Sequence, residues 1–314
     1  MSEGRHRLET RTAVLLGGIR LIRNEFFDFS SSMEANRRAL ERDSRLVAGP
    51  TEKVFSCKDV QINSGLAARV YRPSDSSGLP VILYFHGGGW VVGSVSTHDN
   101  LCRKLANRAR AVVVSVDYRL APENKYPAAV EDAYSALQWV QTGAGAFGGD
   151  PARLAVAGDS AGGNLAAVSC LVTRDRGGPP VRFQALLYPG LDAANLDSES
   201  YRLNGSGYYL TKKAIERVIQ LYINEAADLL DPYVSPLRAA DVRGLPPGLV
   251  ITAQFDPLCS EGEAYAARLS DAGIPCTLHR YEGMIHGFAS FTGLLPHAAQ
   301  AIGEMAAAIT GALR

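Results

Sequence analysis

The sequence has no net charge, no long apolar run and few cysteines, and each absence excludes a class of protein. Its 314 residues include 32 basic and 32 acidic ones, which give a formal charge of zero. The electrostatic footprint of a nucleic-acid-binding protein, or of one held to an anionic membrane surface, is therefore missing. No segment approaches about eighteen uninterrupted apolar residues, and the mixed charges at the N-terminus leave no signal-peptide core. We expect a cytoplasmic protein that contacts neither nucleic acid nor membrane.

The cysteines are too few and too scattered to build a disulfide framework or a zinc site. Their number is odd, and no two of them have the spacing C-x-x-C. We expect all of them to be reduced and mostly structural: Cys57, Cys102, Cys170, Cys259 and Cys276.

What the sequence does contain is a regular alternation of strand-like and helix-like segments. With 46% apolar residues, a chain of this length can bury a large core in one catalytic domain. The alternation predicts an α/β fold, with a mostly parallel central sheet of about eight strands and helices on both faces. Two segments that alternate apolar and polar residues predict an antiparallel start of the sheet. The predicted strands are 54–62, 67–72, 81–85, 111–116, 153–157, 183–188, 248–254 and 276–281, and the helices lie near 97–109, 128–141, 161–174, 261–272 and 298–313.

Two segments lie outside this alternation. Residues 1 to about 45 carry apolar side chains at near-helical spacing, which predicts an amphipathic helix. Residues from about 192 to 230 form an insertion after a predicted strand, and they include a helix near 212–222.

The most informative motif is Gly158-Asp159-Ser160-Ala161-Gly162. It follows the buried run 154–157 and precedes the apolar stretch 165–172. That order predicts the strand, sharp turn and helix of a nucleophile elbow, in which flanking glycines allow the turn and leave the serine hydroxyl exposed. The motif alone is a modest signal, because glycine and serine are common and a loop would satisfy it.

Other motifs supply the groups that such a serine needs. The strand 81–85 runs into His86-Gly87-Gly88-Gly89-Trp90, a glycine run whose backbone can approach a ligand closely. Asp256 and His286 each lie just past a predicted strand. A lone histidine is more often structural than catalytic, and an aspartate before a proline can simply cap the following helix.

Taken together, these motifs resemble the hormone-sensitive-lipase family of carboxylesterases, the bacterial family IV esterases of the α/β-hydrolase superfamily. The resemblance covers roughly residues 45–314, and its pieces follow the order found in the family. They are His86-Gly87-Gly88-Gly89-Trp90, Asp117-Tyr118-Arg119-Leu120-Ala121-Pro122-Glu123, Gly158-Asp159-Ser160-Ala161-Gly162-Gly163, Asp256-Pro257-Leu258 and His286-Gly287-Phe288.

The resemblance implies a catalytic triad of Ser160, Asp256 and His286, in the chain order of α/β hydrolases. Ser160 would be the nucleophile, His286 the base that removes its proton, and Asp256 the acid that orients His286. No metal and no organic cofactor are implied, and the sequence has neither H-E-x-x-H nor a phosphate-binding loop.

An oxyanion hole would be formed by the backbone N–H groups of Gly88, Gly89 and Ala161. In the family, the histidine at position 86 supports this loop rather than transferring protons, and Gly87 would shape the turn. We expect Asp159 to be structural, and we expect His98 to lie at the surface.

The resemblance also implies a cap over the active site, formed by 1–45 and by the insertion at about 192–230, on a catalytic domain of residues 46–314. The alternative is that the N-terminal helix packs on the surface or on a second subunit.

Family members hydrolyse short- to medium-chain acyl esters. By analogy with the family, a homodimer through the sheet edge near 276–281 is possible. Nothing else in the sequence requires such a dimer. Aromatic candidates for the substrate pocket are Phe26, Phe27, Trp90, Tyr208 and Tyr209.

Two further details concern the family motifs. The charged cluster 117–123 should brace the glycine loop, with Arg119 and Glu123 as paired charges. The family usually continues its Asp-Pro-Leu motif with Arg-Asp-Glu-Gly, where this chain has Cys259-Ser260 before Glu261 and Gly262. We expect that departure to affect local packing more than chemistry.

Three alternatives to an esterase remain. Gly-Asp-Ser-Ala-Gly-Gly resembles the nucleophile motif of trypsin-like proteases, but those proteases place His and Asp before Ser on all-β barrels. Acyl transfer, amide hydrolysis, deacetylation or lactone opening would use the same triad, because the triad does not select the acyl group. A binding-only protein on the same scaffold is the third alternative, although such proteins typically lose a triad member.

Overall fold

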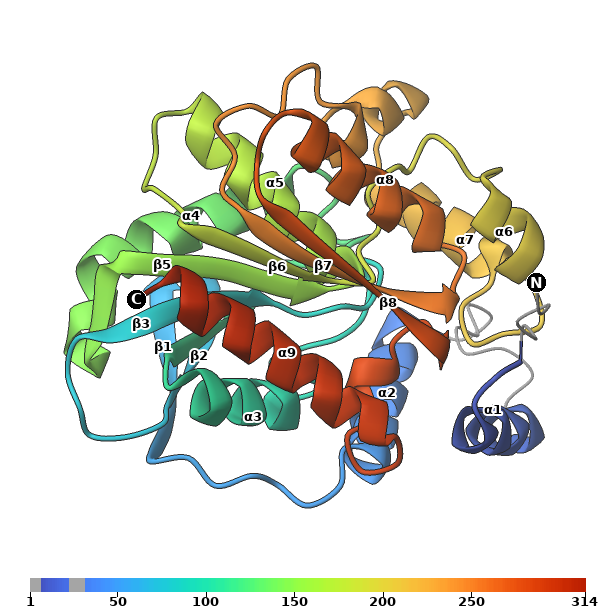
Figure 1. Ribbon diagram of the computed structural model, residues 1–314, viewed down its shortest axis with the longest axis horizontal. Coiled ribbons are helices and arrows are strands. Elements are labelled where there is room, and N and C mark those ends of the chain that lie inside the picture. Colours follow the sequence, from blue (N-terminus) through green and yellow to red (C-terminus); the bar gives the residue numbers. More distant parts are fainter. Residues whose placement is uncertain (1–6, 23–31) are drawn as a thin grey trace.

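The protein is organised around one eight-stranded sheet with the order β1-β2-β4-β3-β5-β6-β7-β8. The computed structural model describes residues 7–22 and 32–314 (Figure 1). The first two strands pair antiparallel with each other and β2 pairs antiparallel with β4, whereas every later pair is parallel. The strands are β1 (Ser56–Asn63), β2 (Leu66–Arg72), β3 (Leu79–Phe85), β4 (Val112–Asp117), β5 (Gly149–Asp159), β6 (Phe183–Leu187), β7 (Gly248–Phe255) and β8 (Cys276–Ile285). The predicted α/β architecture is confirmed.

Helices cover both faces of the sheet, and this explains why its central strands are apolar throughout. Along β3, Val81, Leu83 and Phe85 point into one core, while Ile82 and Tyr84 point into the other. Both sets are fully buried, as expected of parallel strands that are covered on two sides. One face carries α3 (Asp99–Ala109) and α9 (Pro296–Ala312), and the other carries α4 (Ala128–Gly143), α5 (Ala161–Asp175) and α8 (Cys259–Asp271), as Figure 1 shows.

Where the sequence predicted an amphipathic helix, the described part of the N-terminal segment, residues 7–22 and 32–47, contains α1 (Thr10–Ile22) and α2 (Met33–Val47). The side chain of Ser32 caps α2 by accepting a hydrogen bond from the Ala35 N–H at 3.2 Å. The N–H of Glu9 donates to the Gly283 carbonyl at 3.2 Å, which places the start of α1 beside the edge strand β8.

Polar contacts attach α2 to the loops that follow β3 and β4. The Arg37 guanidinium donates to the carbonyls of Val91 and Ala121, each at 2.9 Å, and it pairs with Glu123 at 2.7 Å. The predicted pair of Arg119 with Glu123 is wrong, because Arg119 pairs instead with Asp132 of α4 at 2.7 Å. The spacing within the motif could not reveal these pairs, because Asp132 and Arg37 both lie outside the motif.

The insertion after β6 contains α6 (Glu199–Asn204), α7 (Lys212–Tyr222) and two short 3-10 turns, η2 (Ala226–Leu230) and η3 (Pro236–Arg238). The helix that the sequence predicted near 212–222 is therefore present, and the Thr211 side chain caps it by accepting from the Ala214 N–H. The other 3-10 turns are η1 (Ala144–Phe147) and η4 (Phe288–Ser290). None of the helices formed by residues 7–22 and 32–314 combines the length and the apolar character that crossing a membrane requires.

Candidate active site

A sharp turn between β5 and α5 presents Ser160. The residue has φ 56° and ψ −122°, a left-handed conformation that is costly for a residue other than glycine. The turn needs glycine at position 162, because a Cβ there would overlap the Phe85 carbonyl oxygen. Ser160 thus precedes the first residue of α5, where the helix dipole favours negative charge. The predicted elbow is present.

A chain of hydrogen bonds joins Ser160 to two side chains from other strands. His286 follows β8, and its Nε2 lies 2.9 Å from the Ser160 Oγ. Its Nδ1 lies 2.7 Å from Oδ2 of Asp256, which follows β7 and is fully buried. The other oxygen of Asp256 accepts from the Leu258 N–H at 2.9 Å. Asp256 therefore caps the next turn and orients His286 at the same time.

The glycine loop lies beside this chain of hydrogen bonds. Gly88 has φ 128° and Gly89 has φ 62°, so the loop uses conformations that side chains rarely adopt. Both glycines and Ala161 border the same cavity as Ser160. In the part of the chain that the structure describes, no protein acceptor is found for the N–H groups of Gly88, Gly89 or Ala161. These donors are available to a bound ligand.

His86 holds the loop from behind. Its Nδ1 donates to the Gly87 carbonyl at 2.9 Å, and its own carbonyl accepts from the Tyr118 hydroxyl at 2.7 Å. Complete burial lowers the pKa of His86 to about 3, so the ring is neutral and transfers no proton near neutral pH. His86 thus contacts the glycine loop through both its ring and its carbonyl.

Asp159 ties the elbow to the glycine loop. Its Oδ1 accepts from the Tyr84 hydroxyl at 2.8 Å and from the Gly87 N–H at 2.9 Å. His98 Nε2 lies 3.2 Å from Oδ2. Burial raises the pKa of Asp159, but the charge of His98 and these hydrogen bonds outweigh burial and leave the pKa below its ordinary value. The expectation that His98 lies at the surface is wrong, since only 7% of it is exposed.

A largely apolar cavity of about 130 Å³ opens over Ser160 and His286. Its walls come from the glycine loop, the insertion after β6, and α2. The residues that line it include Leu40 and Ser44 from α2, and Leu210, Ala214, Ile215, Val218 and Ile219 from the insertion.

Comparisons with known proteins agree with this geometry. Residues 82–290 match a family model described as an alpha/beta hydrolase fold. The chain belongs to the α/β-hydrolase family. A carboxylesterase, NlhH of Mycobacterium tuberculosis, is 44% identical over 253 residues, which cover 79% of each chain. An ethyl acetate hydrolase of Pseudomonas putida is 38% identical and covers 83% of this chain and 85% of its own.

The structure of a hyperthermophilic esterase from Pyrobaculum calidifontis superimposes on this hydrolase with a TM-score of 0.91. The two chains are 42% identical, and the match covers 97% of this chain and 98% of the other. The predicted resemblance to the carboxylesterases of the hormone-sensitive-lipase family is thereby confirmed.

The aromatic pocket candidates of the hydrolase have different positions. Trp90 and Tyr209 line the cavity. Trp90 also stacks on Tyr222 of α7, with ring centroids 4.4 Å apart. Tyr208 packs against Phe255 at 5.0 Å and is not among the residues found to line the cavity. Phe26 and Phe27 lie outside the described residues.

The sequence did not identify most of the cavity wall. The apolar face of α7, with Ile215, Val218 and Ile219, lines the cavity. The sequence shows apolar residues at helical spacing in this segment. That spacing does not indicate whether the apolar face of the helix packs on a core or lines a substrate cavity. His98 was missed for a similar reason, because a histidine at the start of a helix carries no sign of its burial.

The unusual pair Cys259-Ser260 joins the insertion to α8. The Ser260 N–H donates to the Ser200 hydroxyl at 3.1 Å, and the Ser200 N–H donates to the Ser260 hydroxyl at 3.2 Å. Cys259 is buried and begins α8, and its Sγ donates to Glu263 at 3.3 Å. Ser260 thus joins α6 to α8, whereas the hydrogen bond of Cys259 stays within α8.

Proposed function

We propose that this hydrolase is a serine carboxylesterase with Ser160 as nucleophile, His286 as proton carrier and Asp256 as the orienting acid. The observation that carries the proposal is the continuous hydrogen-bonded chain from Asp256 through His286 to Ser160, which ends in the cavity. A serine hydroxyl is a weak nucleophile by itself, and an adjacent base is what activates it.

Hydrolysis then takes place in two acyl transfers. In the first, the Ser160 Oγ bonds to the ester carbonyl carbon while His286 takes its proton. The tetrahedral intermediate collapses, the bond to the alcohol oxygen breaks, and His286 gives that oxygen its proton. In the second, a water molecule gives His286 a proton and bonds to the acyl carbon. The bond between the acyl carbon and the Ser160 Oγ breaks, the carboxylic acid leaves, and His286 returns its proton to Ser160.

The N–H groups of Gly88, Gly89 and Ala161 are proposed to stabilise the oxyanion of both tetrahedral intermediates. They border the cavity beside Ser160 and have no protein acceptor among the described residues. Donors fixed in advance need no reorganisation during the reaction, and each such donor is worth about 3 kcal/mol of transition-state stabilisation.

Short- to medium-chain acyl esters are the proposed substrates. The cavity is small, at about 130 Å³, and its walls are mostly apolar. Relatives named carboxylesterase and ethyl acetate hydrolase point to the same class of small ester. If p-nitrophenyl esters of about sixteen carbons were hydrolysed faster than those of four to six, this part of the proposal would be wrong.

The decisive experiment is the initial rate of p-nitrophenyl butyrate hydrolysis by the purified protein and by its Ser160→Ala variant. We expect ready turnover by the intact protein. The variant should lose nearly all of it, because removal of a triad member lowers kcat by about 10⁴-fold or more. Equal rates from the two proteins would exclude Ser160 as the nucleophile.

Residues 1–45 and the insertion at about 192–230 are proposed to form a cap over the site, with residues 46–314 as the catalytic domain. Side chains of α2 and α7 line the cavity beside the elements of the sheet, which supports this division. A cap of this kind limits the access of water to the acyl-enzyme. A water molecule must still enter for the second step.

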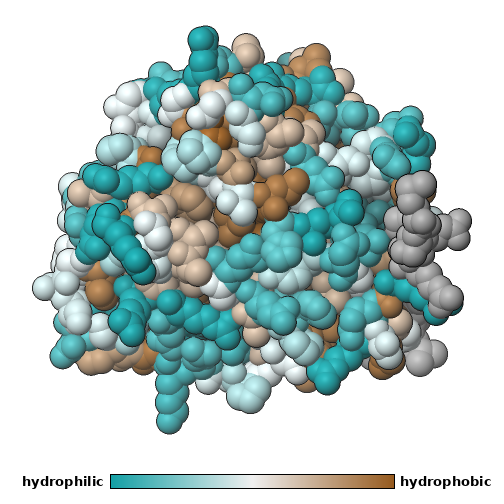
Figure 2. Space-filling model, in the orientation of Figure 1, coloured by the Kyte–Doolittle hydropathy of each residue, from teal (hydrophilic) through white to brown (hydrophobic). Residues whose placement is uncertain are grey.

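A homodimer through β8 is a further proposal. The strand is at the edge of the sheet, and Leu278 on it is 43% exposed. Figure 2 shows a small patch of hydrophobic residues near the middle of the face that Figure 1 presents, with hydrophilic residues around it. An exposed edge strand offers main-chain groups to a second copy. Light scattering that gave a monomer at working concentration would exclude this dimer.

We also propose a cytoplasmic location. The five cysteines are unpaired, as expected in a reducing compartment, which supports it. Fractionation of the native host, followed by an assay of each fraction, tests this assignment.

A further inference from the structure

A second histidine–carboxylate pair lies beside the proposed active site and has no role in the mechanism above. It consists of His98, which precedes α3, and Asp159, which precedes Ser160. Their closest atoms, His98 Nε2 and Asp159 Oδ1, are 3.1 Å apart, and the exposed fractions of the two side chains are 8% and 5%. Both residues also border the substrate cavity.

The hydrogen-bond partners of His98 bear on how many protons its ring carries. The Thr97 hydroxyl has one proton, which it donates to the Ser94 carbonyl at 2.8 Å. The same hydroxyl oxygen lies 2.8 Å from His98 Nδ1, and it can accept from Nδ1 when its proton points to Ser94. On the opposite side, Nε2 faces a carboxylate, which only accepts. A ring that donates from both nitrogens would satisfy these contacts, and such a ring is an imidazolium.

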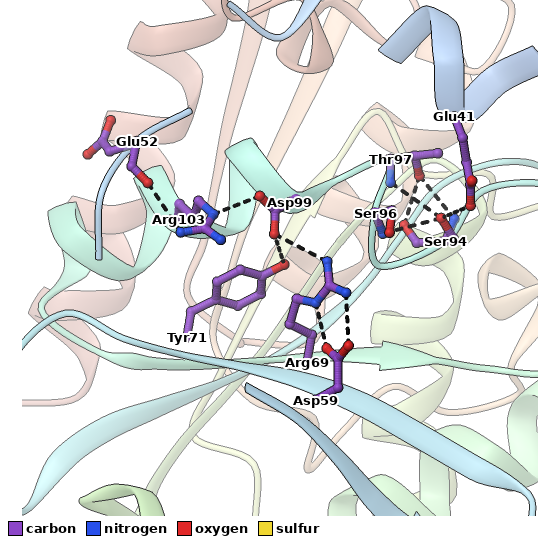
Figure 3. Close-up of polar contacts among 10 residues, drawn as sticks. All are labelled: Glu41, Glu52, Asp59, Arg69, Tyr71, Ser94, Ser96, Thr97, Asp99 and Arg103. Atoms are coloured by element: carbon purple, nitrogen blue, oxygen red, sulfur yellow. Dashed lines mark hydrogen bonds and ion pairs between the residues drawn. The ribbon is translucent and has the colours of Figure 1, made fainter. Parts of the chain in front are cut away.

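The turn that sets this arrangement is held from the N-terminal segment. Figure 3 shows Ser94 with its hydroxyl directed to Glu41 of α2, and hydrogen bonds from Thr97 and Ser96 converge on Ser94. The Ser94 hydroxyl donates to Glu41 at 2.9 Å and accepts from the Ser96 N–H at 3.2 Å. The Thr97 hydroxyl is thus held in a turn that keeps the Ser94 carbonyl within hydrogen-bond distance as its acceptor.

We propose that His98 is a positioning residue for ester hydrolysis: its imidazolium compensates the Asp159 carboxylate, and Asp159 in turn holds the Gly87 N–H and so the glycine loop in place for the oxyanion. The proposal rests on the esterase function proposed above. Without a cation beside it, the buried carboxylate would repel the negative charge that develops in the adjoining oxyanion hole.

The other titratable groups around His98 are consistent with this role. From the end of β3, Tyr84 and His86 face it, with ring centroids 6.2 Å and 5.7 Å away. Tyr84 is protonated because burial raises its pKa, and His86 is neutral because burial lowers its pKa to about 3. Asp99, the next residue, is occupied by Arg69, Tyr71 and Arg103 in the separate cluster of Figure 3. Asp159 is therefore the carboxylate that pairs with His98.

The first test compares the kinetics of His98→Gln with a matched control, His279→Gln. A glutamine at position 98 can still donate to Asp159 but has no charge. His279 also contacts a carboxylate, that of Glu304 at 2.8 Å, but it lies on the exposed part of β8. With p-nitrophenyl butyrate, we expect kcat to fall about tenfold in His98→Gln with KM within twofold. The control should keep both parameters within twofold.

Rates are measured below the melting temperature of every protein, so that loss of fold is not mistaken for loss of kcat. An unchanged kcat in His98→Gln would overturn the proposal. So would a change confined to KM, because that would assign His98 to substrate binding rather than to the transition state.

A second measurement needs no variant that could fail to fold. In wild-type protein labelled with ¹⁵N-histidine, the His98 ring should show two protonated nitrogens, and in Asp159→Asn it should show one. A single protonated nitrogen in the wild type would overturn the proposal. This spectrum does not depend on turnover, so it decides the state of His98 even if Ser160→Ala shows that the esterase mechanism itself is wrong.

Discussion

Substitution of Gly88 by alanine should disable catalysis while leaving most of the fold intact. Gly88 has φ 128°, which an alanine rarely adopts, and its carbonyl accepts from the N–H groups of Val91 and Val92 at 3.2 Å and 3.0 Å. A Cβ at this position would overlap the Val92 carbonyl oxygen. Backbone must therefore move at the very residue whose N–H is proposed to bind the oxyanion.

The expected magnitude has two parts. A non-glycine residue in such a conformation costs on the order of 1–3 kcal/mol of stability. Displacement of one oxyanion donor costs about 3 kcal/mol of transition-state stabilisation, or about 10²–10³-fold in kcat. We expect Gly88→Ala to lower kcat by that factor with little change in KM, and to lower the melting temperature by several degrees.

Gly145→Ala is the matched control, because a Cβ at Gly145 would meet open space in the 3-10 turn η1. It should keep the kcat and the melting temperature of the parent within error. Both variants are assayed with p-nitrophenyl butyrate beside thermal unfolding. A folded Gly88→Ala protein whose kcat stays within threefold of the parent would refute the assignment of this loop as the oxyanion hole.

Two further substitutions follow from the buried carboxyl groups. Asp256→Asn should lower kcat by about 10⁴-fold without unfolding the protein, because an asparagine can hold His286 in the wrong tautomer; a loss under tenfold in stopped-flow hydrolysis would contradict the triad. Burial raises the pKa of Glu261 well above its ordinary value of 4.5. The folded state therefore binds more protons there than the unfolded state, and stability falls as the pH rises above 4.5 toward the raised pKa. Glu261→Gln keeps an acceptor for the N–H groups of Leu191 and Asp192, so its melting temperature should fall less than that of the parent between pH 5 and 9; parallel curves would contradict this.

The sheet and the meeting of Ser160, Asp256 and His286 were predictable because each has a local signature. Buried strands of a parallel sheet are runs of apolar residues, and the predicted strand at 81–85 lies within β3, Leu79–Phe85. The elbow needs glycines around Ser160 for steric reasons that leave a mark in the sequence. Because parallel strands end at one edge, residues that follow strands meet there, as Asp256 and His286 do.

The pairing of charges and the cavity wall were not predictable, because they depend on which distant segments meet. Arg119 forms an ion pair with Asp132, and Glu123 forms one with Arg37, although Arg119 and Glu123 belong to one motif. His98 is buried beside Asp159, which is 61 residues away in the sequence, and no local pattern records that contact.

The most direct measurement is covalent labelling of the nucleophile. The protein is incubated with a p-nitrophenyl phosphonate, and the modified residue is located by mass spectrometry of peptides while the released p-nitrophenol is counted. The account predicts one equivalent of p-nitrophenol, one phosphonyl group on Ser160 and complete loss of esterase activity, with no labelling of Ser160→Ala. Loss of activity with the label on another residue, or full activity in protein labelled at Ser160, would contradict it.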